Sequence, residues 1–205
     1  NLQYLNVSTQ RQVIGFTSSS SGEGKTFCAL NLATVMALSG KRTLLIDADL
    51  RNASLHTKMK LDNSIGLTNY LTGACTPPEA FQKTPVPNLA FMGAGPLPPN
   101  AADLLAGSRM VSLLSIGLEV FDLIVVDGPP VMGLADAAIL SNTASATVFV
   151  VGAGHAKSGL VRGALRRLQL ARSPLIGAVL TKFDAKTAGY GYGYGYGYGY
   201  GYGKD

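Results

Sequence analysis

The chain has 205 residues, of which 47% are hydrophobic and 14% are charged, so it is large enough to bury the core of one globular domain. Its longest apolar runs stop far short of the roughly 18 residues that a membrane-spanning helix needs, which argues against a transmembrane segment. Cys28 and Cys75 form no CxxC or Cys/His pattern, so we expect two reduced packing residues rather than a disulfide or zinc site.

The first residues contain neither a starting Met nor a secretory leader. Asn1 to Leu5 read like a segment entered part-way, so we expect that an upstream anchor or domain could precede them. The net charge of +5 comes partly from a basic cluster near the C-terminal end of the chain. Its five members are Lys157, Arg162, Arg166, Arg167 and Arg172. A solvated helix face is the expected reading, with anionic lipid or nucleic acid as open alternatives.

Short apolar runs alternate with helical patterns along the chain. The predicted strands are 12–17, 43–46, 89–92, 123–126, 147–151 and 176–180, and the predicted helices are 25–39, 108–120, 135–141 and 158–171. Because helices separate the strands and several strands are apolar throughout, the fold class is α/β: a doubly wound, mainly parallel sheet flanked by helices. Gly40 is expected as a helix C-cap and Ser108 as an N-cap. Residues 74–99 are rich in proline and are expected to be irregular near the site.

A serine- and glycine-rich loop follows the first predicted strand and opens the first predicted helix. The loop, residues 18–26, has the sequence SSSSGEGKT. Gly22 and Gly24 allow backbone N–H groups to turn towards phosphate oxygens, and the helix start adds its positive dipole end. Lys25 is expected to reach the β- and γ-phosphates, and the Thr26 hydroxyl is expected to bind Mg²⁺. The predicted nucleotide-binding residues are Ser21, Gly22, Glu23, Gly24, Lys25, Thr26 and Phe27.

Three aspartates stand at the ends of two predicted buried strands. Asp47 and Asp49 close the run that begins at Thr43, and Asp127 closes the run that begins at Leu123. Ligands of open parallel sheets bind beyond the carboxyl ends of the strands, so these carboxylates are expected to converge on the phosphate loop. The alternative is that they are ordinary turn and capping residues. His56 and His155 belong to no recognisable constellation and receive no role.

These motifs together resemble the bacterial tyrosine kinases (BY-kinases) of capsule and exopolysaccharide synthesis, over nearly the whole chain. The phosphate loop is similar to their Walker A motif, the string from Leu45 to Arg51 to Walker A′, and Val126 to Pro130 to Walker B. Residues 95–105 also resemble a Pro-Pro-Asn…Leu-Leu stretch of that family. The resemblance implies a protein-tyrosine kinase that uses ATP and Mg²⁺.

The resemblance assigns roles by position. It implies catalytic roles for Lys25, Asp47, Asp49 and Asp127, with Thr26, Asp47 and Asp127 at the metal. Either Asp47 or Asp49 would accept the proton of the incoming tyrosine.

The chain departs from the family pattern at several positions. Ser19 replaces the first loop glycine, Gly128 stands where threonine is frequent, and Thr181 occupies the place of an asparagine that contacts adenine. Asn52-Ala53 replace a basic residue and proline, and residues 1–12 lack the Glu-x-x-Arg-x-x-Arg helix that joins subunits into a ring.

The C-terminal end of the chain alternates glycine and tyrosine. We expect a catalytic domain at 1–188 and a disordered tail at 189–205 whose tyrosines are the phosphate acceptors. They are Tyr190, Tyr192, Tyr194, Tyr196, Tyr198, Tyr200 and Tyr202. An extended chain spans about 3.3–3.6 Å per residue, so the tail could reach its own site or that of a neighbouring subunit. A low-complexity adhesive tail is the alternative.

The resemblance further implies a membrane activator or polysaccharide copolymerase segment as partner, a homo-oligomer, and a location at the inner face of the plasma membrane. Nucleic acid is not expected as a partner. The alternative function is a P-loop ATPase switch of the septum-positioning or partitioning type. Proteins of that type carry an additional loop lysine where this chain has Ser20, which favours the kinase.

Overall fold

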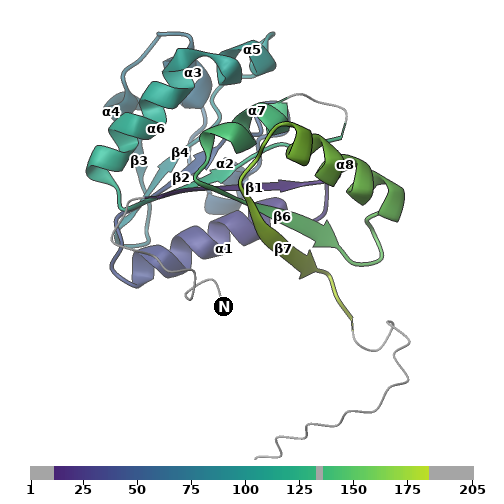
Figure 1. Ribbon diagram of the computed structural model, residues 1–205. Helices are drawn as coiled ribbons and strands as arrows, with labels where there is room; N and C mark the ends of the chain where they lie inside the picture. The colour runs from purple at the N-terminus through teal and green to yellow at the C-terminus, as the bar shows by residue number, and fades with distance from the viewer. Residues whose placement is uncertain (1–11, 133–135, 185–205) are drawn as a thin grey trace, which may run out of the picture.

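The computed structural model describes residues 12–132 and 136–184. In these ranges the chain forms a seven-stranded sheet in the order β3-β4-β2-β5-β1-β6-β7, drawn in Figure 1. Every neighbouring pair is parallel except β3 and β4. The strands are β1 (Gln12–Ser18), β2 (Thr43–Asp47), β3 (Gln82–Lys83), β4 (Leu89–Met92), β5 (Leu123–Asp127), β6 (Ala146–Gly152) and β7 (Leu175–Thr181).

The strands at the middle of the sheet are apolar on both faces because helices cover both. Every residue of β2 and of β5 is buried. The helices are α1 (Lys25–Leu38), α2 (Leu55–Met59), α3 (Leu67–Leu71), α4 (Pro77–Ala80), α5 (Ala101–Ala106), α6 (Ser108–Val120), α7 (Asp136–Thr143) and α8 (Ser158–Leu170). The predicted doubly wound α/β fold is thereby confirmed.

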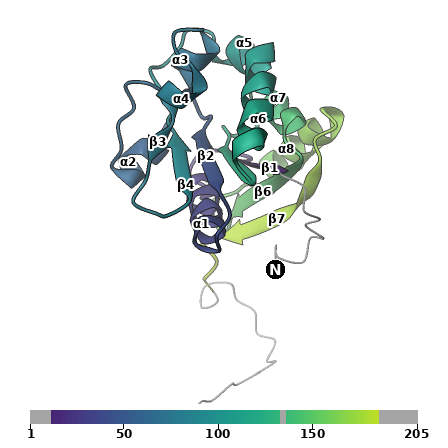
Figure 2. The same ribbon diagram turned by 90° about the vertical axis from the view of Figure 1, so that its left-hand side faces the viewer.

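Two large clusters of apolar side chains and one smaller one fill the space between the sheet and its helices. On one face, Ala29 and Ala33 of α1 pack against Val125 of β5. On the other face, Leu113 of α6 packs with Ile124 of the same strand. Figure 2 shows α1 on the side of the sheet opposite to α3, α5 and α6. The third cluster places α8 over β6.

The predicted strands and long helices match the observed ones to within one or two residues, apart from the caps. Ser108 is the first residue of α6 and Gly107 is its N-cap, so the predicted cap was one residue late. At the end of α1 the C-cap is Ser39, and Gly40 follows it with φ of 94°. Gly40 is therefore the left-handed residue just beyond the cap, where glycine is favoured.

The region between Leu55 and Ala106 contains structure that the sequence pattern did not predict. Four short helices and β3 lie there. Pro77 and Pro78 start α4, inside a capping box formed by Thr76 and Glu79. The other prolines of this region lie outside helices and strands, as predicted. Proline is favoured at the first position of a helix because its missing N–H has no partner there.

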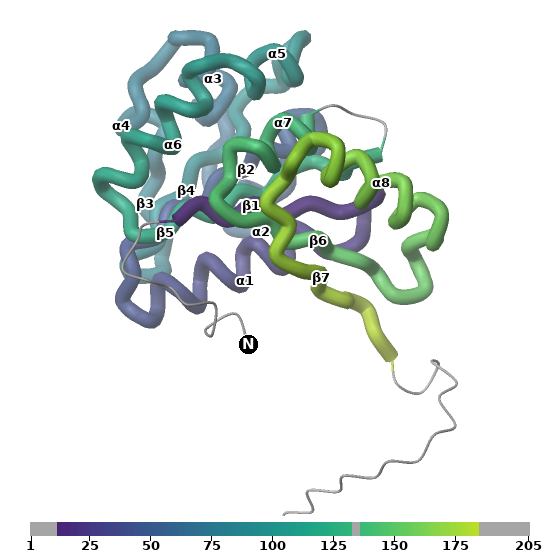
Figure 3. Tube along the Cα trace, viewed as in Figure 1, coloured from purple at the N-terminus to yellow at the C-terminus, as the bar shows by residue number. Residues whose placement is uncertain are grey.

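Within the described ranges no helix has the length and apolar character needed to cross a bilayer. The predicted tail, with its seven tyrosines, and residues 1–11 and 133–135 lie outside the described residues. The path from β1 through the phosphate loop into α1 can be followed in Figure 3.

Candidate nucleotide-binding site

The phosphate loop connects β1 at the middle of the sheet to the N-terminus of α1. Gly22 and Gly24 have φ of 79° and 97°, in the left-handed region that side chains with a Cβ rarely adopt. A Cβ on Gly24 would approach the side chain of Thr181 to between 3.2 and 3.4 Å. The predicted glycine positions are therefore required by the backbone, and α1 starts at Lys25 with its free N–H groups at the loop.

Glu23 holds the loop from inside. Its buried carboxylate accepts hydrogen bonds from the Ser19 hydroxyl, from the Ser20 N–H at 2.7 Å and from the Gly152 N–H at 3.2 Å. Burial alone would raise the pKa of Glu23, but these hydrogen bonds outweigh it and lower the pKa. The side chain of Glu23 therefore faces the protein. Ser19, which departs from the usual glycine, supplies one of its donors.

Ser21 and Phe27, the first and last of the predicted nucleotide-binding residues, lie in different surroundings. The carbonyl oxygen of Ser21 lies 3.1 Å from Nε2 of His155. Because a carbonyl only accepts, Nε2 must carry the proton. Phe27 lies on the solvent side of α1 with 66% of its surface exposed. The structure brings His155, to which the sequence assigned no role, into contact with the loop.

Thr181 joins the end of β7 to the same loop. Its hydroxyl donates a hydrogen bond of 2.5 Å to the Glu23 carbonyl oxygen. The backbone of Thr181 accepts the N–H of Ala153 at 2.9 Å, so the ends of β6 and β7 are tied together beside the loop. Thr181, which occupies the place of the family's adenine-contacting asparagine, therefore contacts the phosphate loop.

Lys25 and Asp49 form a buried ion pair, with Nζ 2.9 Å from Oδ2. Burial alone would lower the pKa of Lys25, but Asp127, Asp49 and Asp47 surround it and together raise the pKa. The lysine therefore stays charged beside the loop.

Asp47 and Asp127 are adjacent partners on β2 and β5, at the carboxyl ends of both strands. Asp47 Oδ2 accepts the N–H groups of Ser54 and Leu55, at 3.1 and 3.0 Å, while Asp127 accepts a hydrogen bond from Thr26. The Oδ1 atom of each carboxylate is buried without a hydrogen-bond partner. The structure thus places all three predicted aspartates at one edge, beside Lys25 and Thr26.

Burial raises the pKa of both Asp47 and Asp127. Burial raises the pKa of Asp47 to about 6, although hydrogen bonds from three backbone N–H groups oppose the change. Burial also raises the pKa of Asp127 to about 7, with Lys25 opposing and Asp47 adding to the rise. Two partnerless oxygens on carboxylates that titrate near neutrality are the groups that a cation would stabilise.

The donor set fits Mg²⁺ better than a transition metal. Among the described residues no three His, Cys, Asp or Glu side chains gather as a metal-binding group. Mg²⁺ is held by one or two carboxylates together with phosphate oxygens and waters, and does not need such a group. Thr26 and Asp127, already hydrogen bonded to each other, match that requirement.

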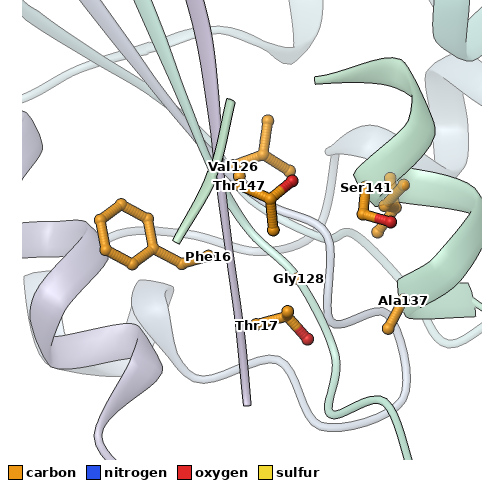
Figure 4. Close-up of a pocket in the computed structure, with 9 residues that line it drawn as sticks. Phe16, Thr17, Val126, Gly128, Ala137, Ser141 and Thr147 are labelled. Carbon is orange, nitrogen blue, oxygen red and sulfur yellow. The ribbon is translucent and has the colours of Figure 1, made fainter. Parts of the chain in front are cut away.

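A small cavity lies behind the loop, between β1 and α7. Figure 4 shows the side chains of Thr147, Ser141 and Thr17 around it, beside the backbone of Gly128. Its volume is about 10 Å³, roughly the space of one water-sized sphere. This cavity is too small to hold a nucleotide. Gly128 suits this packing, because a Cβ there would lie 3.0 Å from the carbonyl oxygen of Phe16.

The fold and this loop define a P-loop nucleotide-binding domain. Residues 14–190 match the family described as CobQ/CobB/MinD/ParA nucleotide binding domain. The septum site-determining protein MinD of Pyrococcus horikoshii, solved as a complex with Mg-ADP, superimposes with a TM-score of 0.70 over 82% of this chain and 69% of its own, at 21% identity. At that identity the likeness shows the fold.

Nearer relatives are kinases. The tyrosine-protein kinase YwqD of Bacillus subtilis is 37% identical over 88% of this chain and 76% of its own length. The kinase domain of the Escherichia coli tyrosine kinase ETK superimposes with a TM-score of 0.86 over 95% of this chain and 77% of the other, at 31% identity. The chain therefore belongs to the bacterial tyrosine-protein kinases. It spans about a quarter of another relative, EpsB of Ralstonia solanacearum, which is 36% identical over 92% of this chain and 25% of its own length.

Proposed function

We propose that the chain transfers the γ-phosphoryl group of Mg·ATP to tyrosine hydroxyls of its own C-terminal Gly-Tyr segment, Tyr190 to Tyr202. The hydrogen bond between Thr181 and the phosphate loop carries this proposal. Thr181 is the last residue of β7, and the first tyrosine of the segment follows nine positions later. The described chain therefore ends three residues after a contact with the loop on which the phosphates would bind.

The proposed nucleotide contacts follow from the loop geometry. The N–H groups around Gly22 and Gly24 and the start of α1 would bind phosphate oxygens, and Lys25 would leave Asp49 to meet the β- and γ-phosphates. Thr26 and Asp127 would hold Mg²⁺, with Asp47 nearby. When bound, the ion neutralises charge on the phosphates. Proteins that bind phosphate at a helix N-terminus do so with these same backbone groups.

The proton of the tyrosine hydroxyl would be accepted by Asp47 or Asp49. Asp47 has the unpartnered Oδ1 atom and a pKa near 6, which suits a general base at neutral pH. Asp49 is occupied by Lys25, so it becomes available only when that ion pair opens. These observations favour Asp47 as the base and Asp49 as the group that holds Lys25 before nucleotide binds.

The biological role is proposed from membership of the bacterial tyrosine-protein kinase family. Regulation of exopolysaccharide or capsule synthesis would follow from the family. A membrane activator or copolymerase segment, a homo-oligomer, and attachment to the inner face of the plasma membrane would follow in the same way. The catalytic unit is proposed to be residues 1–188.

The decisive experiment is intact-mass spectrometry after incubation with Mg·ATP. We expect several additional phosphates, and peptide mapping should confine them to Tyr190–Tyr202. Lys25→Met should abolish them, whereas Lys58→Met, which changes an exposed lysine of α2, should not. Release of inorganic phosphate without any phosphotyrosine would instead indicate the ATPase switch.

A further inference from the structure

The outer face of α8 carries exposed arginines. Between Asp136 and Asp184 the chain contains no Asp or Glu, yet it contains six Lys or Arg residues. Three of them, Arg162, Arg166 and Arg167, are exposed on α8. In the part of the chain that the structure describes, neither Arg162 nor Arg166 forms a salt bridge. We call the surface formed by Gly159, Arg162, Gly163, Arg166 and Gln169 the α8 arginine face.

The packing of α8 fixes which side looks outward. Ala164 and Leu168 are fully buried in the cluster with Phe149 of β6. The side of the helix that carries Ala164 and Leu168 is therefore used by the core, and the side that carries Arg162 and Arg166 faces outward. A Cβ on Gly159 would have no heavy atom within 4 Å, so this part of the face is open to a ligand.

We propose that the α8 arginine face binds the C-terminal Gly-Tyr segment after its tyrosines have been phosphorylated. The proposal rests on the proposed function for the origin of the phosphates. Each phosphotyrosine carries about −1.5 to −2 charges, so the product segment is strongly anionic. Asp47, Asp49 and Asp127 make the catalytic edge repel such a segment, whereas the arginines of α8 attract it.

The spacing of the arginines matches the spacing of the tyrosines. Residues four apart on a helix lie on one face, with Cβ atoms about 5–6 Å apart, which describes Arg162 and Arg166. In an extended Gly-Tyr repeat, alternate residues share one side and are about 6.6–6.8 Å apart. Two successive phosphotyrosines would therefore meet two successive guanidinium groups. Arginine suits this role because its planar fork binds phosphate with two hydrogen bonds.

The segment is also long enough to reach this face. Gly152, at the end of β6, pairs with Thr181 at the end of β7, and α8 begins six residues after Gly152. The helix is about 20 Å long at 1.5 Å per residue. The 21 residues that follow Asp184 could span up to about 70 Å in extended form, so the same subunit or a neighbour can supply them.

The test uses the full chain with Lys25→Met, so that its own tyrosines stay unmodified, and a fluorescent synthetic peptide Gly-pTyr-Gly-pTyr-Gly-pTyr-Gly. Anisotropy should show binding that weakens as salt rises, and the peptide without phosphate should not bind. Adding Arg162→Ala and Arg166→Ala together should weaken binding on the order of tenfold or more, because charge-assisted hydrogen bonds are lost.

Further variants and a second peptide distinguish a specific phosphotyrosine site from nonspecific electrostatic attraction. Arg162→Lys with Arg166→Lys keeps the charge but loses the fork, so it should also weaken binding. Lys58→Ala with Lys60→Ala, two lysines at the end of α2, should leave binding unchanged. A peptide with its phosphotyrosines four residues apart should bind less tightly than the alternating one.

Equal binding by the unphosphorylated peptide would overturn the proposal, as would binding that both double variants leave unchanged. Arginine-dependent binding of phosphatidylserine vesicles or DNA without binding of the phosphopeptide would overturn it in favour of that partner. Because the phosphates are introduced chemically, a failure here is distinct from a failure of the kinase assay. The latter would appear as absent phosphotyrosine in the wild-type chain.

Discussion

The hydroxyl of Thr181 and the carbonyl oxygen of Glu23 are joined by a hydrogen bond of 2.5 Å, across 158 positions of sequence. The bond connects the last residue of β7 to the middle of the phosphate loop. The order of the loop therefore depends on a strand that the chain completes only near its C-terminal end.

Removing the hydroxyl of Thr181 should loosen the loop. Thr181→Val leaves a carbonyl with one fewer donor, which should lower the free energy of unfolding by about 1 kcal/mol and weaken Mg·ADP binding several-fold. Thr181→Ser keeps the hydroxyl and should restore most of the affinity. Calorimetric titration of the nucleotide measures the effect, and equal affinities for the Val and Ser variants would contradict it.

Neutralising Glu23 should destabilise the loop, because its buried carboxylate accepts several of the loop's hydrogen bonds. Glu23→Gln exchanges a carboxylate that only accepts for an amide with two donors, among groups that are themselves donors. We expect a loss of about 1–3 kcal/mol in urea unfolding. Glu119→Gln, on the exposed side of α6, is the matched control and should be neutral. A neutral Glu23→Gln would show that the carboxylate does not hold the loop.

Alanine substitutions at Gly24 and Gly154 would distinguish the cost of backbone strain from the cost of a steric clash. Both have positive φ, 97° and 69°, but a Cβ would meet Thr181 at Gly24 and nothing within 4 Å at Gly154. Gly154→Ala should therefore show the strain alone, about 1 kcal/mol. Gly24→Ala should lose more stability and also lose nucleotide binding. Thermal melts with and without Mg·ADP compare them, and identical losses would argue against the contact with Thr181.

Stability without ligand should fall as pH rises through neutrality. The pKa values of Asp47 and Asp127 are about 6 and about 7 in the folded protein, above the 3.8 of an unperturbed aspartate. For an acid whose pKa is raised by folding, the stabilising contribution is complete below the unfolded value and is lost as pH passes the folded value. Each unit of displacement is worth at most about 1.4 kcal/mol, and the two carboxylates interact, so their effects will not simply add.

The measurement is urea unfolding at pH 5 and pH 8 without nucleotide or metal. Asp127→Asn should flatten the decline and stabilise the unliganded protein at pH 8, because it removes a buried charge. The same variant should lose the extra stability that Mg·ADP gives to the wild type. A variant less stable than wild type at pH 8 would show that Asp127 stabilises the unliganded fold.

Much of the site could be predicted from sequence because it depends on local order. Asp47, Asp49 and Asp127 end buried strands, and parallel strands bring their carboxyl ends to one edge whatever the details of packing. The glycines at 22 and 24 follow from the same local geometry.

The contacts of His155 and Thr181 could not be predicted in this way. They depend on the register of β6 against β7, including an irregularity between Thr147 and Val148 that no periodicity reveals. The inward turn of Glu23 depends on the N–H of Gly152, which is 129 positions away. The short helices from α2 to α5 were also missed, because four to six residues carry too little periodicity to distinguish a helix from a turn.

The Thr181 contact also has a mechanical meaning. Tension on the chain beyond β7, such as from a molecule that holds one of the tyrosines, would pass along the chain to Thr181, the residue that contacts the loop. Through its hydrogen bond to the Glu23 carbonyl oxygen, a pull on that end would act on the phosphate loop as well as on the sheet.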